Sequence, residues 1–267
     1  MSAVGRALLY GFAVLVGILL IVPLVIVIAV SFSSSEFLAF PPPGLSLRWY
    51  DELLSRPQWS QTLWTSVVVA ALATAISVVV GVCAAVALVR GRFPFKSAIY
   101  VAILTPLIVP EIVTSIAMFF LFSDLHLTDT VVAVAIGQSV VALPLVVLMV
   151  SATLQGFDET LERAAQGLGA TPLVAFRTTT LPIIAPAVLS AALFAFLTSF
   201  DNLLIGLFMG GPSTRTLPVQ IWTSVVMYVE PVIAAIGTVL VVGPVALFAL
   251  AAGLRRMSAA RGRQSGP

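Results

Sequence analysis

Six stretches of this chain are apolar for more than twenty residues each, and they occupy residues 7–30, 61–89, 97–122, 131–154, 183–209 and 231–254. A helix needs about 20 apolar residues to cross the hydrocarbon core of a bilayer, where every backbone amide must bond within its own segment. The first stretch is too long for a removable signal peptide, and no cleavage region follows it. We therefore expect an all-α membrane protein with six transmembrane helices, forming one transmembrane domain over residues 1–267.

The composition supports this class and excludes several others. Hydrophobic residues make up 60% of the chain and charged residues 9%, whereas a soluble domain carries about 25% charged residues. The net charge of +2 is too small for a protein that binds nucleic acid by neutralising phosphates. One cysteine and one histidine exclude Cys-rich and paired-His metal sites. The only lysine, Lys96, follows Phe95 and not the glycine that an ATP-binding phosphate loop requires.

The distribution of Lys and Arg predicts the orientation, because positively charged loops stay in the cytoplasm. With the N-terminus inside, the inner side carries ten of the thirteen basic residues: Arg6, Arg90, Arg92, Lys96, Arg163, Arg177, Arg255, Arg256, Arg261 and Arg263. The outer connections, residues 31–60, 123–130 and 210–230, carry the other three. We expect both termini to be cytoplasmic, a short interfacial helix at 49–54 and a loose basic tail at 255–267.

The long inner connection, residues 155–182, has the composition of structured protein. Asp158 is expected to cap a first short helix, and Gly169 to end it in the left-handed conformation. Thr171 and Pro172 are expected to begin a second short helix, since proline is tolerated at the first helical position. Small residues at 164, 165, 167 and 169 leave a low surface on which another protein can lie closely.

Part of this connection resembles the EAA loop of ABC-transporter permeases. The family's pattern is Glu-Ala-Ala, three residues, Gly, nine residues, Ile, one residue and Leu-Pro. Five of the seven positions match in register, and they are Ala164, Ala165, Gly169, Leu181 and Pro182. Arg163 stands at the Glu position and Thr179 at the Ile position. Glu162 lies beside the substituted site, so either Glu162 or Arg163 is expected to contact a partner.

Further stretches at 107–113, 154–158, 199–201 and 211–220 are similar to the spermidine/putrescine-type branch of these permeases, and specifically to its second permease subunit. The resemblance implies a type I ABC importer permease-like bundle in a bacterial inner membrane. The implied partners are a pair of cytoplasmic ATP-binding subunits, a second permease subunit and an extracytoplasmic solute-binding protein.

The resemblance also implies how the work is divided. ATP and magnesium would bind to the ATPase, so this chain would bind no cofactor and catalyse no reaction. The 155–182 loop would be the coupling segment, pushed by ATPase closure to switch the permease between inward-open and outward-open states.

Two acidic residues, Glu111 and Asp201, fall inside the predicted spans, where an ionisable group is costly unless it faces water or a partner. At about 1.5 Å per residue they lie roughly 21 and 27 Å from the inner ends of their spans. Pro106 and Pro110 precede Glu111 and are expected to distort its helix. No Lys or Arg lies within the spans to neutralise them. One hypothesis is that Glu111, Asp201 and Asn202 line the pathway of a cationic solute. The other is that both acids hold the bundle together.

The leading prediction is a permease subunit that forms half of a pathway for a small organic cation such as a polyamine. Relatives with similar loops carry amino-acid-like, opine-like or phosphonate solutes, and Asn202 replaces a second acid that polyamine members often carry. A more distant alternative is a self-sufficient, ion-coupled secondary transporter, which leaves the structured inner loop unexplained.

Overall fold

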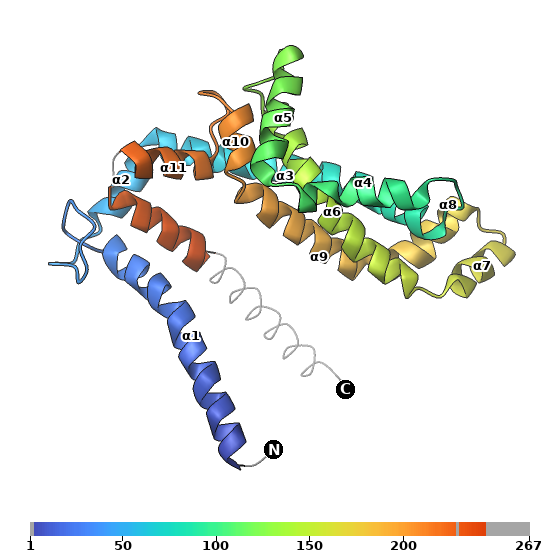
Figure 1. The fold of residues 1–267 in the computed structure, drawn as a ribbon, viewed down its shortest axis with the longest axis horizontal. Coiled ribbons are helices and arrows are strands. Elements are labelled where there is room, and N and C mark those ends of the chain that lie inside the picture. Colours follow the sequence, from blue (N-terminus) through green and yellow to red (C-terminus); the bar gives the residue numbers. More distant parts are fainter. Residues whose placement is uncertain (1–2, 228–229, 244–267) are drawn as a thin grey trace, which may run out of the picture. The chain divides into compact units, whose positions relative to one another are not determined.

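The computed structural model describes residues 3–227 and 230–243. They form helices and the connections between them (Figure 1), and they divide into two compact units. One unit contains the described residues of 1–60 and 223–267, and the other is Gln61–Trp222.

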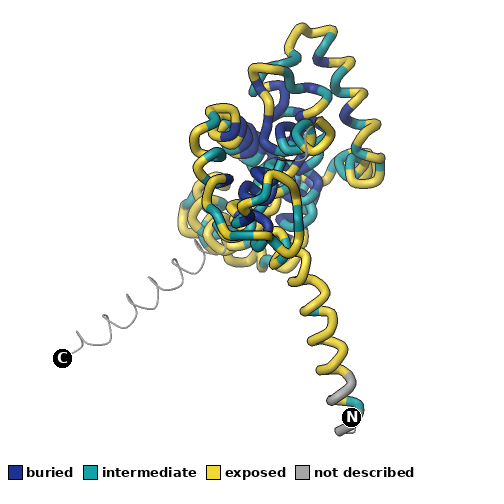
Figure 2. Tube along the Cα trace, turned by 90° about the vertical axis from the view of Figure 1, so that its left-hand side faces the viewer, coloured by how far each residue is buried: buried dark blue, intermediate teal, exposed yellow. Residues whose placement is uncertain are grey.

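Helix α1 (Ala3–Ser31) contains the first predicted span. Its side chains are apolar on all sides and are exposed along nearly the whole helix. In Figure 2 it is the helix that runs to the N-terminus. A helix that is apolar on every side requires lipid or another subunit around it.

The same unit holds α2 (Arg48–Ser55), the short helix expected at 49–54. Trp49 is buried, and its indole nitrogen donates to the carbonyl of Ser33 at 2.8 Å. Tyr50 shares a hydrogen bond of 2.7 Å with the hydroxyl of Ser31. These bonds fix α2 against the end of α1.

A helix over Val232–Gly243 lies in the described part of the sixth apolar stretch. The rest of that stretch, 244–254, and the predicted tail at 255–267 lie outside the described residues. Just before this helix, Glu230 accepts a hydrogen bond of 3.0 Å from Arg56 within the same unit.

The second unit is built around α6 (Val131–Gln155), which lies alongside α9 (Leu181–Phe200) in Figure 1. Ala142 on α6 and Ala191 and Ala195 on α9 are fully buried in the cluster between them. Small side chains let two helix backbones approach closely in a membrane. Helix α3 (Pro57–Arg90) packs on α6 as well, and Ser77 donates to the carbonyl of Ser139 at 3.2 Å.

The third apolar stretch, expected as one span over 97–122 distorted by Pro106 and Pro110, is broken in the structure. It forms α4 (Lys96–Ile108) and α5 (Glu111–Asp124), which meet at an angle of 106°. Pro110 has no N–H to continue the ladder and biases the preceding residue towards extended backbone. Val109 is indeed extended, with φ −72° and ψ 132°.

The fifth apolar stretch also breaks, where a single helix through residue 209 was expected. Helix α9 ends at Phe200, and α10 (Leu204–Met209) begins after three residues that are not helical. Helix α10 packs against α5 and α6. The connection expected at 210–230 contains α11 (Leu217–Met227).

Between α6 and α9 lie α7 (Glu159–Gly167), α8 (Pro172–Ala175) and the π-helical turn η1 (Phe176–Thr180). Within the described residues, four helices are long and apolar enough to span a membrane, or five spans if the bent α4–α5 pair counts as one. The six spans and the cytoplasmic termini stay predictions.

Candidate functional site

Helix α7 begins and ends where the sequence indicates. The carboxylate of Asp158 accepts a hydrogen bond of 2.9 Å from the backbone N–H of Thr160, and this bond lowers the pKa of Asp158. At the other end, Gly169 has φ +96°, which a residue with a Cβ rarely adopts. Its N–H bonds to Gln166, and the N–H of Ala170 bonds to Ala165, which together form a Schellman motif.

Two separate short helices were expected within the loop, with the second ending before Pro182. The structure differs, because the second helix continues past Pro182. Thr171 caps it, with Pro172 in the first turn, and the chain then runs through η1 directly into α9. Pro182 cannot donate to the carbonyl four residues earlier, and its ring crowds that carbonyl. We attribute the wider π-helical turn before Pro182 to this conflict. Leu181 and Pro182 therefore start a long helix.

Glu162 is held inside the chain. Its carboxylate accepts hydrogen bonds from Arg90 at 2.6 Å and from the hydroxyl of Thr180 at 2.5 Å. Arg90 also reaches Thr180 at 3.4 Å and lies 5.4 Å from the ring centre of Phe157. The side chains of Arg90 and Glu162 are only 20% and 13% exposed. This cluster joins α7 to the ends of α3 and η1.

Arg163 lies at the surface. Its side chain is 72% exposed, and its ion pair among the described residues is with Glu159, at 3.9 Å. Ala164, Gly167 and Gly169 are exposed beside it, and Leu168 is 91% exposed. Of the two residues that the sequence left open as a partner contact, Arg163 is thus the one available at the surface.

The second group of predicted site residues lies where the broken helices meet. Glu111 is the first residue of α5, and its carboxylate accepts a hydrogen bond of 2.5 Å from the side-chain amide of Asn202. The amide oxygen of Asn202 accepts from the N–H of Ile205 at 3.0 Å, in the first turn of α10. Asn202 is buried, at 6% exposed.

Asp201 is not part of this contact. It is exposed at the end of α9, and within the described residues its carboxylate has no ion pair or hydrogen bond. The depth comparison between Glu111 and Asp201 assumed straight helices, so the 106° bend removes its basis. The structure brings Glu111 to Asn202 through the packing of α5 on α10.

Sequence reasoning missed several residues that complete these groups. Neither Arg90, which lies outside the loop, nor Thr180, which lies within it, was linked to Glu162, because no spacing rule relates residues this far apart in the chain. It also missed Asp129, which joins the α5–α6 connection to the turn after α10. The carboxylate of Asp129 accepts from the hydroxyls of Ser213 at 2.6 Å and Thr214 at 2.7 Å.

The pKa of Asp129 shows how these bonds compete with burial. Partial desolvation raises it and is the largest single cause, but the combined hydrogen bonds from Ser213 and Thr214 outweigh it. The pKa of this carboxyl is therefore lowered from 3.8.

The model of the family described as "Binding-protein-dependent transport system inner membrane component" matches residues 77–259. The putrescine transport system permease protein PotI of Escherichia coli (strain K12) is 35% identical over 232 residues, covering 84% of this chain and 82% of PotI. The spermidine/putrescine transport system permease protein PotC of the same strain is 31% identical over 239 residues, covering 90% of each.

Two further matches are broader. The sulfoquinovosyl glycerol transport system permease protein SmoH of Agrobacterium fabrum is 32% identical over 190 residues, covering 69% of this chain and 66% of SmoH. The crystal structure of a bacterial ABC transporter involved in import of the acidic polysaccharide alginate contains a chain of the same fold. The two chains superpose with a TM-score of 0.70 at 15% sequence identity. The match covers 96% of the present chain and 98% of the chain from the alginate importer.

These matches confirm the resemblance seen in the 155–182 loop. Members of this family are multi-pass inner membrane proteins, which catalyse no reaction and bind no cofactor themselves. The chain therefore belongs to the binding-protein-dependent transport system inner membrane components, the permease subunits of ABC transporters.

Proposed function

We propose that this permease forms half of an import pathway for a small organic cation such as a polyamine, and that the 155–182 loop couples it to a separate ATPase. The relatives PotI and PotC, named for putrescine and spermidine transport, support the solute class. The partners in this proposal are a pair of ATP-binding subunits, a second permease and an extracytoplasmic solute-binding protein. All six spans and both cytoplasmic termini belong to it.

The coupling proposal is supported by the different surroundings of two neighbouring residues on α7, Glu162 and Arg163. Glu162 anchors the helix to Arg90 and Thr180, while Arg163 and the small residues after it face outward. An anchored helix with a low outer surface transmits a push to α3 and α9 without first bending away from them. Rigid elements that move together are a common way to switch a transporter between two states.

The pathway part of the proposal concerns the two helix breaks. Glu111 keeps a carboxylate where α5 begins, and the exposed carboxylate of Asp201 lies at the end of α9. The α4–α5 stretch, residues 97–124, contains no Arg or Lys, and the α9–α10 stretch, residues 181–209, contains none either. Backbone breaks at membrane depth are tolerated where they line a cavity or are buried in protein. In our proposal Asp201 contacts the cation, while Glu111 sets the local negative charge and holds Asn202.

Coupling is tested by crosslinking in native membranes. Single-cysteine variants Ala164→Cys and Gly167→Cys, in a chain with Cys83→Ser, should capture an ATP-binding subunit. A cysteine at Ser55, on the exposed end of α2, is the matched control and should capture none. If Ala164→Cys and Gly167→Cys are no more reactive towards that subunit than the control, the coupling role is wrong.

The solute class is tested with the assembled, reconstituted transporter. Putrescine and spermidine, presented by the solute-binding protein, should raise ATP hydrolysis above that seen with amino acids, phosphonates or sulfoquinovosyl glycerol. Asp201→Asn should weaken the response to the amines. The relative SmoH, named for a sulfoquinovosyl glycerol system, favours the alternative of an uncharged or anionic solute. Stimulation by such a solute and not by amines would assign this chain to that alternative.

A further inference from the structure

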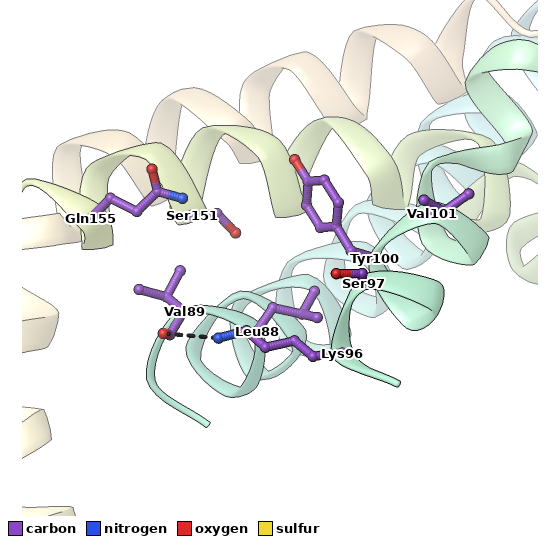
Figure 3. A pocket seen from close by; sticks show the side chains of 8 residues that line it. All are labelled: Leu88, Val89, Lys96, Ser97, Tyr100, Val101, Ser151 and Gln155. Atoms are coloured by element: carbon purple, nitrogen blue, oxygen red, sulfur yellow. Dashed lines mark hydrogen bonds between the residues drawn. The ribbon is translucent and has the colours of Figure 1, made fainter. Parts of the chain in front are cut away.

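A cavity of about 460 Å³ lies between the ends of three helices in the second unit (Figure 3). Leu88 and Val89 come from the end of α3, Lys96 and Tyr100 from the start of α4, and Ser151 and Gln155 from the end of α6. The distribution of basic residues predicts that all three helix ends lie at the inner membrane surface. The cavity then sits at the boundary between the cytoplasmic headgroups and the acyl chains.

The polar side of the cavity is made of donors. The ammonium group of Lys96 donates to the carbonyls of Val89 at 3.3 Å and Gly91 at 3.2 Å. An ammonium has three donors, so one is left for a ligand. The side chains of Tyr100 and Gln155 form no hydrogen bond with another protein group in the described part of the chain, and no acidic residue lines the cavity.

Ser151 provides a second, independent observation. It is 4% exposed, and its hydroxyl has no hydrogen-bond partner among the described residues. A buried hydroxyl without a partner is costly, and most such groups in folded proteins are satisfied. In Figure 3 the side chain of Ser151 extends from α6 towards the space that Leu88, Val89 and Tyr100 surround.

The other wall of the cavity is apolar, with Leu88, Val89 and Val101 along it. A ligand that fits both walls has an anionic, hydrogen-bond-accepting end and a hydrocarbon end. A polyamine does not fit, because Lys96 would repel it and no carboxylate faces it. Basic pockets between transmembrane helices on the cytoplasmic side suit phospholipid headgroups.

We propose that this cavity binds an anionic phospholipid, whose phosphate lies on Lys96 and Ser151 and whose acyl chain lies along Val89 and Val101. The inference rests on the inner-surface position proposed for these helix ends, and it does not depend on the solute or on coupling. A phosphate group could also come from free inorganic phosphate, so the experiment includes both sources.

The test uses native mass spectrometry on the full chain in mild detergent. Phosphatidylglycerol and phosphatidylethanolamine with the same acyl chains are added separately. Wild type should retain the anionic lipid, and Lys96→Gln should lower its affinity about fivefold, the effect of one lysine near an anionic surface. Lys96→Arg should restore most of it. Arg92→Gln removes an exposed charge from the same loop but outside the cavity, and it should leave retention unchanged.

Ser151→Ala separates ligand binding from folding. Its hydroxyl has no internal partner, so the variant should unfold at the same temperature as wild type or higher, yet retain less phosphatidylglycerol. If Lys96→Gln and Arg92→Gln lost equal amounts of phosphatidylglycerol, general surface charge would explain retention and the proposed site would be wrong. Equal retention of both lipids, or displacement of the lipid by millimolar inorganic phosphate, would overturn the lipid assignment.

Discussion

Arg90 and Glu162 are 72 residues apart in the chain, yet the guanidinium of Arg90 donates to the carboxylate of Glu162 at 2.6 Å. Thr180 donates to the same carboxylate oxygen. Helix α7 has no buried residue of its own, so this polar cluster is its main anchor to the rest of the unit. A surface ion pair contributes little to stability, but a mostly buried one with a third partner contributes more.

We predict that Glu162→Gln uncouples ATP hydrolysis from transport. The change replaces a charge-assisted bond with a neutral one and weakens the anchor by about 1.5–3 kcal/mol, which corresponds to roughly a tenfold or greater loss of coupled uptake. A double-mutant cycle with Arg90→Gln should give a large interaction energy, because both changes remove the same contact. The control is Glu36→Gln, which breaks an exposed pair with Arg48 in the other unit. Additive effects of Glu162→Gln and Arg90→Gln would contradict the anchor.

The contact between Glu111 and Asn202 predicts different effects for the two acids at the helix breaks. Glu111→Ala should lower the free energy of unfolding by about 1–3 kcal/mol, because the buried amide of Asn202 loses its acceptor. Asp201→Asn should leave stability unchanged, since Asp201 is exposed. Thermal unfolding in detergent measures both. Equal stability of the two variants would show that Glu111 does not hold Asn202.

Gly81 marks a close approach of α3 to α6. A Cβ at this position would lie 2.6 Å from Cγ1 and 2.9 Å from Cβ of Val146, a stiff β-branched side chain. We predict that Gly81→Ala lowers the free energy of unfolding. Overpacking costs about 1–3 kcal/mol, and the better helix propensity of alanine offsets only about 0.5–1 kcal/mol of this. Gly17→Ala on α1 is the matched control, because nothing lies within 4 Å of its added Cβ. A rise in unfolding temperature for Gly81→Ala would refute the close approach.

The hydrogen bonds to Asp129 predict a pH dependence. Its pKa in the folded chain is below 3.8, so the carboxylate stabilises the folded state fully above that value. This contribution is lost as the pH falls through the folded pKa. The unfolding temperature of wild type should therefore approach that of Asp129→Asn only below about pH 4. Asp124→Asn is the control, since Asp124 is exposed and forms no such bonds in the described part of the chain. A constant difference between wild type and Asp129→Asn down to pH 3 would contradict this role, because about pH 3 lies below the unperturbed aspartate pKa of about 3.9, where the contribution should already be decreasing.

Local chemistry let the sequence predict much of this protein. The apolar stretches predict the long helices α1, α3 and α6, because burial in lipid depends on composition over about 20 residues. The caps of α7 at Asp158 and Gly169 follow from rules that span only a few residues. Register in the 155–182 loop was enough to indicate the family, since that pattern too is contiguous in the chain.

The tertiary structure decided what depends on residues distant in sequence. The bend at Pro110 and the break at Asp201 matter because they place Glu111 beside Asn202, and no local pattern contains that pairing. Likewise, Glu162 and Arg163 are neighbours in the chain, but only the packing of α7 on α3 and η1 turns one inward and the other outward. Hydrogen bonds between separate helices are set by how their surfaces fit, and that fit is a property of the whole fold.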